Sequence, residues 1–165
     1  MSTADTRAKE QAKAQLESIV DMVKRLEHAR ECPGDEDCKL PDSEICAGLN
    51  LSYQEGDTAT EEEREEYHDE EAARQSISED PLSVQVRSDW HTPGDEDNKP
   101  TEYTILLCTG GPACRIIGDL DGFQQPDTAK LEYQDWFTPW AGYHDATLED
   151  GETLLSYAQQ FYFGS

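Results

Sequence analysis

The sequence has few basic side chains, with 13 Lys and Arg against 37 Asp and Glu in 165 residues and a formal net charge of −24. Proteins bind nucleic acid and anionic membranes largely through Lys and Arg, so this charge argues against both as partners. No apolar run reaches the roughly 18 residues that a membrane span requires. Residues 1–31 contain no apolar block of the kind that signal peptides carry. We therefore expect a soluble, cytoplasmic protein whose partners are basic surfaces.

Hydrophobic residues are also scarce, at 35% of the chain. This is below the roughly 45–50% of an average domain, so part of the chain does not belong to a core. Residues 1–31 hold 6 basic and 6 acidic side chains, residues 32–80 hold 3 and 17, and residues 81–165 hold 4 and 14. The Val, Ile, Leu and aromatic residues gather after Pro81. The sequence therefore predicts an acidic, helical N-terminal region over 1–80 and an α+β core over 81–165.

The N-terminal region is predicted to contain two helices joined by a long acidic loop. Apolar residues at three- and four-residue spacing predict an amphipathic helix over about 6–30. We expect it to pack on the rest of the chain, with a dimer through this helix as the alternative. Residues 32–59 contain Pro, Gly and Asp at short intervals and no regular spacing of apolar residues, which predicts a loop. The second helix is predicted over about 61–78, because Thr60 and Glu63 form a capping box and Pro81 disfavours continuation.

After Pro81 the apolar period changes to two, which is typical of β-strands. Short connections between the strands favour antiparallel neighbours. Apolar residues over about 149–162 predict a C-terminal helix packed on the sheet. The predicted fold class is therefore α+β: two N-terminal helices, an antiparallel sheet of about four strands, and a C-terminal helix. The predicted strands are Ser83–Arg87, Glu102–Thr109, Ala113–Leu120 and Thr128–Phe137.

The predicted helix over 61–78 is acidic nearly all round and has little apolar face to bury. Carboxylates three or four residues apart lie about 5–6 Å from one another and destabilise a helix, so folding gives no reason to accumulate them. Their spacing is comparable with that of phosphates along a nucleic-acid strand, so they can occupy a basic nucleic-acid groove. A solvated helix that serves solubility and adaptation to high salt are the alternatives. The predicted partner-binding residues are Glu61, Glu62, Glu65, Glu66, Asp69 and Glu70, with Asp35, Glu36, Asp37, Asp95, Glu96 and Asp97 as loop contacts.

The five cysteines occur in a chain without an export signal, so a disulfide framework is not expected. Cys32, Cys38 and Cys46, with His28 upstream, could supply four zinc ligands. Their intervals of five and seven residues match no compact zinc motif, however. We interpret them as ordinary thiols and predict neither a metal nor a cofactor.

No enzyme is expected. His91 and His144 are accompanied by no nucleophile elbow, paired-histidine metal motif or dinucleotide fingerprint. Cys108 and Cys114 flank a Gly-Gly-Pro turn, which places them opposite each other in a hairpin. We expect two reduced thiols there, with a disulfide as the alternative.

Aromatic residues and prolines gather around Trp90, Trp136 and Trp140. Such residues at strand ends are expected to close the core. They could instead anchor an interface through the aromatic end of the sheet, with acidic residues on its rim. The alternative function is therefore a protein-interaction or regulatory module in which acidity serves solubility.

Four sequence blocks carry a resemblance: SVQVRSDWHTPG, YTILLCTGGPACRIIGDLD, LEYQDWFTPW and LLSYAQQFYFG. Over about Pro81–Ser165 they resemble the C-terminal region of small acidic proteins carried by bacteriophages and integrated mobile elements. The composition is also similar to that of DNA-mimic antirestriction and anti-CRISPR proteins, which is an analogy of charge. The resemblance implies a mobile-element context and supplies no catalytic residues. The predicted function is inhibition of a basic DNA-binding host protein, a CRISPR effector or a restriction enzyme, by nucleic-acid mimicry in the bacterial cytoplasm.

Overall fold

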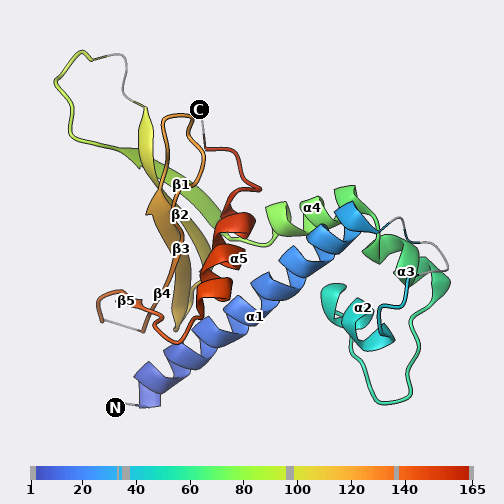
Figure 1. Ribbon diagram of the computed structural model, residues 1–165. Coiled ribbons are helices and arrows are strands. Elements are labelled where there is room, and N and C mark those ends of the chain that lie inside the picture. Colours follow the sequence, from blue (N-terminus) through green and yellow to red (C-terminus); the bar gives the residue numbers. More distant parts are fainter. Residues whose placement is uncertain (1–2, 33, 35–37, 96–98, 136–137, 164–165) are drawn as a thin grey trace. The chain divides into compact units, whose positions relative to one another are not determined.

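The structure, a computed structural model, describes residues 3–32, 34, 38–95, 99–135 and 138–163 (Figure 1). The chain forms two compact units, Met1–Ile19 with Asp80–Ser165, and Val20–Glu79. We call them the sheet unit and the helical unit. Helix α1 (Thr3–Glu31) contributes residues to both. None of the described helices combines the length and the apolar character needed to cross a membrane.

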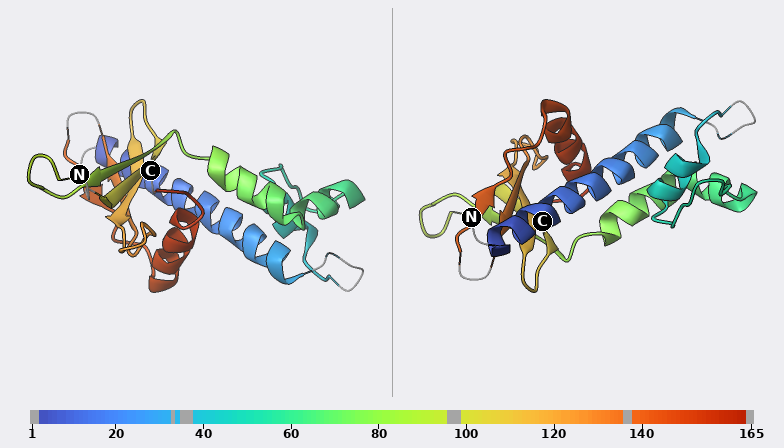
Figure 2. Two further views of the ribbon diagram at one scale, coloured as in Figure 1. Left: turned by 90° about the horizontal axis from the view of Figure 1, so that it is seen from above. Right: turned by 90° about the horizontal axis from the view of Figure 1, so that it is seen from below.

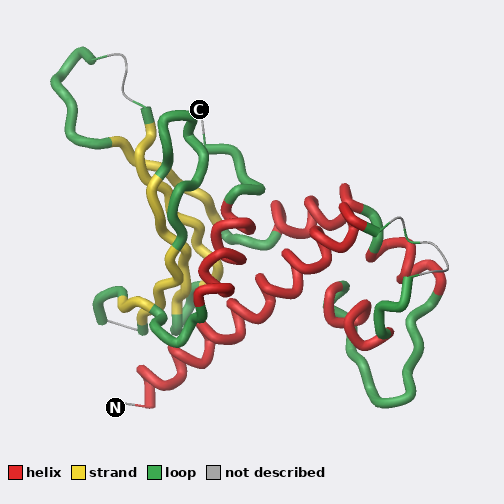
Figure 3. Tube along the Cα trace, viewed as in Figure 1, coloured by secondary structure: helices red, strands yellow, loops and turns green. Residues whose placement is uncertain are grey.

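The sheet unit confirms the predicted α+β class and the antiparallel sheet (Figure 3). The strands follow one another in sequence order, from β1 to β5. There are five of them among the described residues and not four, because the two-residue strand β5 pairs with Glu132 and Tyr133 of β4. A strand of two residues is too short to show the alternation of apolar and polar residues by which strands are predicted. The strands are β1 (Ser83–Ser88), β2 (Pro100–Cys108), β3 (Ala113–Asp119), β4 (Lys130–Gln134) and β5 (Ala141–Gly142).

The two faces of the sheet differ in polarity because side chains alternate along each strand. Ile105, Ile116 and Leu131 are register partners on neighbouring strands and are all buried. The opposite face carries cross-strand ion pairs, Arg87 with Glu102 at 2.6 Å and Arg115 with Glu132 at 2.8 Å. The apolar face therefore forms the core of this unit, and the charged face is the more exposed one.

Helix α5 (Leu148–Ala158) and the first part of α1 run along the sheet (Figures 1 and 2). Helix α5 begins at a capping box made by Thr147 and Asp150. Tyr157 in α5 is completely buried, and its hydroxyl donates to Asp80 Oδ2 at 2.7 Å. Lys9 of α1 pairs with Asp145, just before α5, at 2.8 Å. The apolar face of the sheet is thus covered by residues from both ends of the chain.

The helical unit corrects two predictions. The predicted loop over 32–59 contains a helix, α2 (Asp42–Gly48), which begins after Pro41 with acidic residues in its first turn and buries Ile45 and Cys46. At seven residues it is too short to show a helical period. The single helix predicted over 61–78 is two helices, α3 (Glu61–Tyr67) and α4 (Glu70–Glu79). His68 and Asp69 separate them.

The segment 61–78, predicted to have little apolar face, buries three apolar side chains. Tyr67, Ala73 and Ile77 are buried, with 3%, 0% and 0% of their surface exposed. The break at His68 separates α3 from α4, so these residues do not lie on the face of one continuous helix. The predicted capping box of Thr60 and Glu63 is confirmed at the start of α3. The helical unit therefore has a small apolar core of its own.

Candidate functional site

Helix α3 presents its carboxylates to solvent. Glu61, Glu62, Glu65 and Glu66 are all exposed, and none of them forms a salt bridge with a described residue. In a helix, side chains at 61 and 65, or at 62 and 66, lie on one face about 5–6 Å apart. Four of the six helix residues predicted for partner binding therefore form one exposed acidic surface. We call these four residues the α3 carboxylates.

Helix α3 is held in place by contacts from other parts of the helical unit. Seven residues are too few for a stable isolated helix in water. The buried guanidinium of Arg25 donates to the carbonyl oxygen of Glu66 at 3.0 Å and to Ser76 Oγ at 3.1 Å. Arg64 forms an ion pair with Asp42 at the start of α2. These contacts fix the positions from which the α3 carboxylates project.

The other two predicted helix residues have structural partners. Asp69 Oδ1 accepts hydrogen bonds from the backbone N–H groups of Glu71 and Ala72, at 3.0 and 3.2 Å, and so caps the start of α4. Glu70 pairs with Arg30 at 3.1 Å and with Arg74 at 3.0 Å. Both carboxylates therefore have partners within the helical unit, whereas the α3 carboxylates form no salt bridge with a described residue.

Of the six predicted loop contacts, the structure describes Asp95 alone. Asp95 is exposed and belongs to the sheet unit, between β1 and β2. The remaining predicted contacts lie outside the described residues. These are Asp35, Glu36, Asp37, Glu96 and Asp97.

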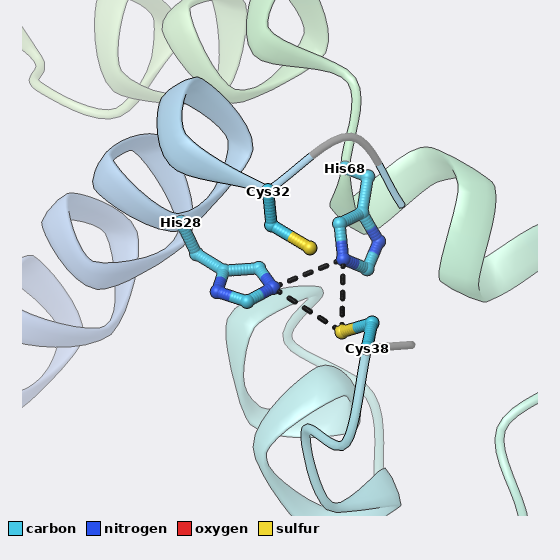
Figure 4. A group of neighbouring side chains, drawn as sticks. All are labelled: His28, Cys32, Cys38 and His68. Carbon is cyan, nitrogen blue, oxygen red and sulfur yellow. Dashed lines mark hydrogen bonds between the residues drawn. The ribbon is translucent and has the colours of Figure 1, made fainter. Parts of the chain in front are cut away.

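A cluster of two cysteines and two histidines lies in the helical unit: His28, Cys32, Cys38 and His68, all half-buried (Figure 4). Their side chains point toward one another, and one donor atom of each lies within 4.8 Å of the other three. His28 Nε2 is 3.0 Å from His68 Nε2. Cys38 Sγ is 3.5 Å from His28 Nε2 and 3.3 Å from His68 Nε2. We call these residues the Cys–His cluster.

The backbone explains why these four residues meet. The N–H of Cys32 donates to the carbonyl oxygen of His28 at 2.8 Å, which continues α1 by one residue and puts both side chains on one helix face. Gly34 turns the chain after Cys32, with a φ of 79° that disfavours any other residue. A Cβ on Gly34 would lie 3.1 Å from His68 Cβ, so the turn packs directly against that histidine. His68 itself ends α3.

A hydrogen bond fixes which ring nitrogen of His68 faces the cluster. His68 Nδ1 lies 2.7 Å from the carbonyl oxygen of Arg64. A carbonyl oxygen only accepts, so Nδ1 carries the proton and Nε2 of the neutral ring keeps its lone pair. Burial and the neighbouring His68 lower the pKa of His28. The ring of Tyr67 lies beside both histidines, with centroid distances of 5.6 and 5.7 Å.

The Cys–His cluster differs from the four residues that the sequence offered as possible zinc ligands. Cys46 is buried in α2 and is not a member of the cluster, whereas His68 is. His68 is separated from Cys38 by 30 residues and from His28 by 40, so local spacing gives no signal for it. The helix break at His68, which no sequence pattern marks, brings its ring toward the end of α1.

The hairpin thiols lie as predicted. Cys108 pairs with Cys114 in the register of β2 and β3, and both are free thiols. Cys114 is fully buried, and its burial next to Cys108 raises the pKa of its thiol. Cys114 is thus a part of the core and lacks the exposure that a reactive cysteine needs, whereas Cys108 is half-buried.

The aromatic residues predicted to gather at one end of the sheet lie at both of its ends. Trp140 follows β4, and Arg115 lies over its ring at 4.1 Å. Trp90 follows the last residue of β1, which lies at the same end of the sheet as the last residue of β3. Trp90 and Trp140 are therefore at opposite ends of the sheet. Trp90 is fully exposed, as is most of Phe123 in the connection from β3 to β4. Trp136 lies outside the described residues.

No protein-family model matches the chain, and neither do any of the curated proteins or solved structures with which it was compared. The resemblance of Pro81–Ser165 to acidic proteins of phages and mobile elements therefore stays a prediction.

Proposed function

We propose that the protein is a non-enzymatic anti-defence factor of a phage or mobile element, which inhibits a basic nucleic-acid-binding protein of its bacterial host. The α3 carboxylates would occupy the Lys- and Arg-rich groove of that target in place of nucleic acid. The observation that carries the proposal is the exposure of Glu61, Glu62, Glu65 and Glu66 on a helix anchored by Arg25 and Arg64. A CRISPR effector and a restriction enzyme are the leading target types.

Two features support mimicry over a merely solubilising helix. The anchoring of α3 fixes the spacing of its negative charges, which a solubilising surface does not require. The α3 carboxylates also form no salt bridge with a described residue, whereas Glu70 next to them forms two. Carboxylates that form no salt bridge within the protein can attract a basic partner. Such attraction speeds association and makes binding sensitive to salt.

The test begins with capture of host proteins on the immobilised full chain at low and high salt. The affinity of each captured nucleic-acid-binding protein is then measured for the wild type and for a variant with Glu61→Gln, Glu62→Gln and Glu65→Gln. Exposed ion pairs contribute about 0.2–1 kcal/mol each, so the triple variant should lose about 0.6–3 kcal/mol, or about 3- to 150-fold in affinity. Duplex DNA should compete with the wild type for the same partner.

A matched variant controls for the change in total charge. Glu149→Gln, Glu152→Gln and Asp127→Asn remove the same number of exposed carboxylates from the sheet unit. This variant should keep the affinity of the wild type. Equal losses in both variants would indicate non-specific electrostatics. Recovery only of partners unrelated to nucleic acid, at all salt concentrations, would contradict mimicry altogether.

A second candidate function, a protein-interaction module, is favoured by the exposure of Trp90 and Phe123 at one end of the sheet. Large exposed aromatics are common anchors of interfaces. If these residues bind the partner, Trp90→Ala with Phe123→Ala should weaken binding more than the triple Gln variant does. Binding of this kind should also change little with salt.

A further inference from the structure

We propose that His28, Cys32, Cys38 and His68 bind one zinc ion, which stabilises the helical unit. This inference does not depend on the proposed function, because none of the α3 carboxylates belongs to the Cys–His cluster.

The distances between the donor atoms fit a single tetrahedral ion. With Zn–N bonds of about 2.0–2.1 Å and Zn–S bonds of about 2.3 Å, the edges of a tetrahedron around zinc measure roughly 3.3–3.8 Å. His28 Nε2 and His68 Nε2 are separated by 3.0 Å, and Cys38 Sγ is 3.3 and 3.5 Å from them. Cys32 Sγ completes the set within 4.8 Å. Three donors are therefore already spaced for a single ion, and Cys32 Sγ, within 4.8 Å of them, would move closer to complete the tetrahedron.

The donor types select zinc over the other common ions. Magnesium and calcium prefer oxygen ligands, whereas two thiolates with two imidazoles form a typical structural zinc site. Two thiolates also neutralise the charge of the ion, which suits a half-buried position. A two-iron cluster with the same ligand types places its cysteines and histidines on different iron atoms. Cys38 lies too close to both histidines for that arrangement.

The outer surroundings are those of a metal-bound histidine. Such a histidine usually donates its second ring N–H to a carbonyl or carboxylate, which fixes the tautomer and the ring orientation. His68 does so through Nδ1 to the carbonyl oxygen of Arg64. The same Arg64 pairs with Asp42, so the ligand geometry is linked to α2.

The helical unit has a physical need for such a site. Small units with few core residues often rely on a metal or a disulfide for stability. The Cys–His cluster joins the end of α1, the segment before α2 and the end of α3, so zinc would act as a crosslink among them. Binding free energy at a site of this kind becomes folding free energy. The buried apolar residues of the unit are Val23, Leu26, Ile45, Cys46, Tyr67, Ala73 and Ile77.

The first measurement is the metal content of the full chain, produced in zinc-supplemented medium and purified without chelator. Elemental analysis should give about one zinc per chain. Replacement of zinc by cobalt should produce the visible absorption of a tetrahedral centre together with thiolate charge-transfer bands. Less than a tenth of an equivalent of zinc, or a Cys32–Cys38 disulfide in the freshly purified protein, would overturn the proposal.

Ligand variants test the assignment of residues. Cys38→Ser and His68→Asn should each weaken zinc binding by more than about 100-fold. Loss of a residue that only hydrogen-bonds to a metal ligand weakens binding by roughly 10–100-fold, so a larger loss indicates a ligand. Cys38→His keeps a donor atom and should bind zinc more tightly than Cys38→Ser. Cys108→Ser and His91→Asn, outside the cluster, should bind as the wild type does. Unchanged zinc affinity in Cys38→Ser and His68→Asn would overturn the proposal.

Hydrogen exchange of the wild type keeps the proposal testable where a ligand variant does not fold. Removal of zinc by a chelator should accelerate amide exchange in α2, α3 and α4. The amides of β2 and β3 should keep their protection. Added zinc should restore the protection of the helical unit, and added magnesium should not. Identical exchange with and without chelator would contradict a structural zinc ion. The triple Gln variant of α3 should retain its zinc, which separates this test from that of the proposed function.

Discussion

At the scale of single residues, the carboxylates of neighbouring residues around α3 and α4 have different roles. Asp69 accepts two backbone hydrogen bonds at the start of α4, whereas the Glu65 side chain is exposed and without a salt bridge among the described residues. Loss of an N-cap side chain costs about 0.5–2 kcal/mol, and Asn caps about as well as Asp. Charge and capping at position 69 can therefore be separated by the choice of substitution.

We predict that Asp69→Ala lowers the free energy of unfolding by about 1 kcal/mol and that Asp69→Asn changes it little. Urea unfolding measures the stability, and hydrogen exchange of the Glu71 and Ala72 amides locates the effect. Glu65→Gln serves as the control for the removal of one negative charge. Equal stability of Asp69→Ala and Asp69→Asn would show that the cap contributes nothing. If Asp69→Asn also weakens partner binding, its charge has a role beyond folding.

Residue types alone could not assign these roles. The sequence correctly predicted the cap of Thr60 and Glu63, because a capping box is a local pattern of residues three apart. The cap of Asp69 was missed, since neither Pro nor Gly marks the break before it. His68 was missed as a member of the cluster for a related reason: its neighbours there come from residues at least 30 positions away. Such a group is created by tertiary structure and has no local signature.

At the scale of elements, the packing of β3 depends on a residue without a side chain. A Cβ on Gly118 would overlap the carbonyl oxygen of Thr128 and lie 2.8 Å from Tyr103 Cε1. The Thr128 carbonyl cannot move away without loss, because it accepts a hydrogen bond from the Tyr103 hydroxyl at 2.6 Å. Burial of Tyr103 raises the pKa of its hydroxyl, which keeps it protonated as a donor. The close approach of β3 to the segment before β4 thus requires glycine.

We predict that Gly118→Ala destabilises the sheet unit by about 1–3 kcal/mol, the usual cost of inserting atoms into a packed site. Gly122→Ala is the matched control, since no atom lies within 4 Å of a Cβ at that position. Urea unfolding followed by tryptophan fluorescence measures both variants. A Gly118→Ala variant as stable as Gly122→Ala would show that β3 and Thr128 separate at little cost.

The strands were easier to predict than the short helices. β2 and β3 carry alternating apolar residues over 9 and 7 residues, long enough for a period of two to be recognised. α2 spans less than two full helical turns, and its residues resemble the surrounding loop in composition. α3 and α4 read as one helix because both favour helix and only their packing separates them. Tertiary contacts, such as those of Arg25 and Tyr67, decided where each short helix begins and ends.

At the scale of the whole molecule, the net charge of −24 opposes compaction. Like charges repel one another in the folded state more than in the expanded unfolded chain. Salt screens this repulsion, since the Debye length falls from about 30 Å at 0.01 M to about 3 Å at 1 M. Salt would also weaken the six salt bridges among the described residues, but these attractions are outnumbered by the repulsions among the 37 acidic side chains. The dominant effect of salt on folding should therefore be stabilising.

We predict that the melting temperature rises by several degrees between about 0.01 and 0.5 M sodium chloride, because about 1 kcal/mol shifts a chain of this size by roughly 2–4 °C. Circular dichroism in chelator-free buffer measures the transition. The triple Gln variant of α3 should melt higher than the wild type at low salt and should respond less to added salt, since it carries less of the repulsion. A chain that unfolds entirely at low salt would instead indicate adaptation to high salt. A melting temperature that falls with salt would mean that attraction within ion pairs outweighs the repulsion among the excess negative charges. Repulsion among the α3 carboxylates would then not limit the stability of the fold.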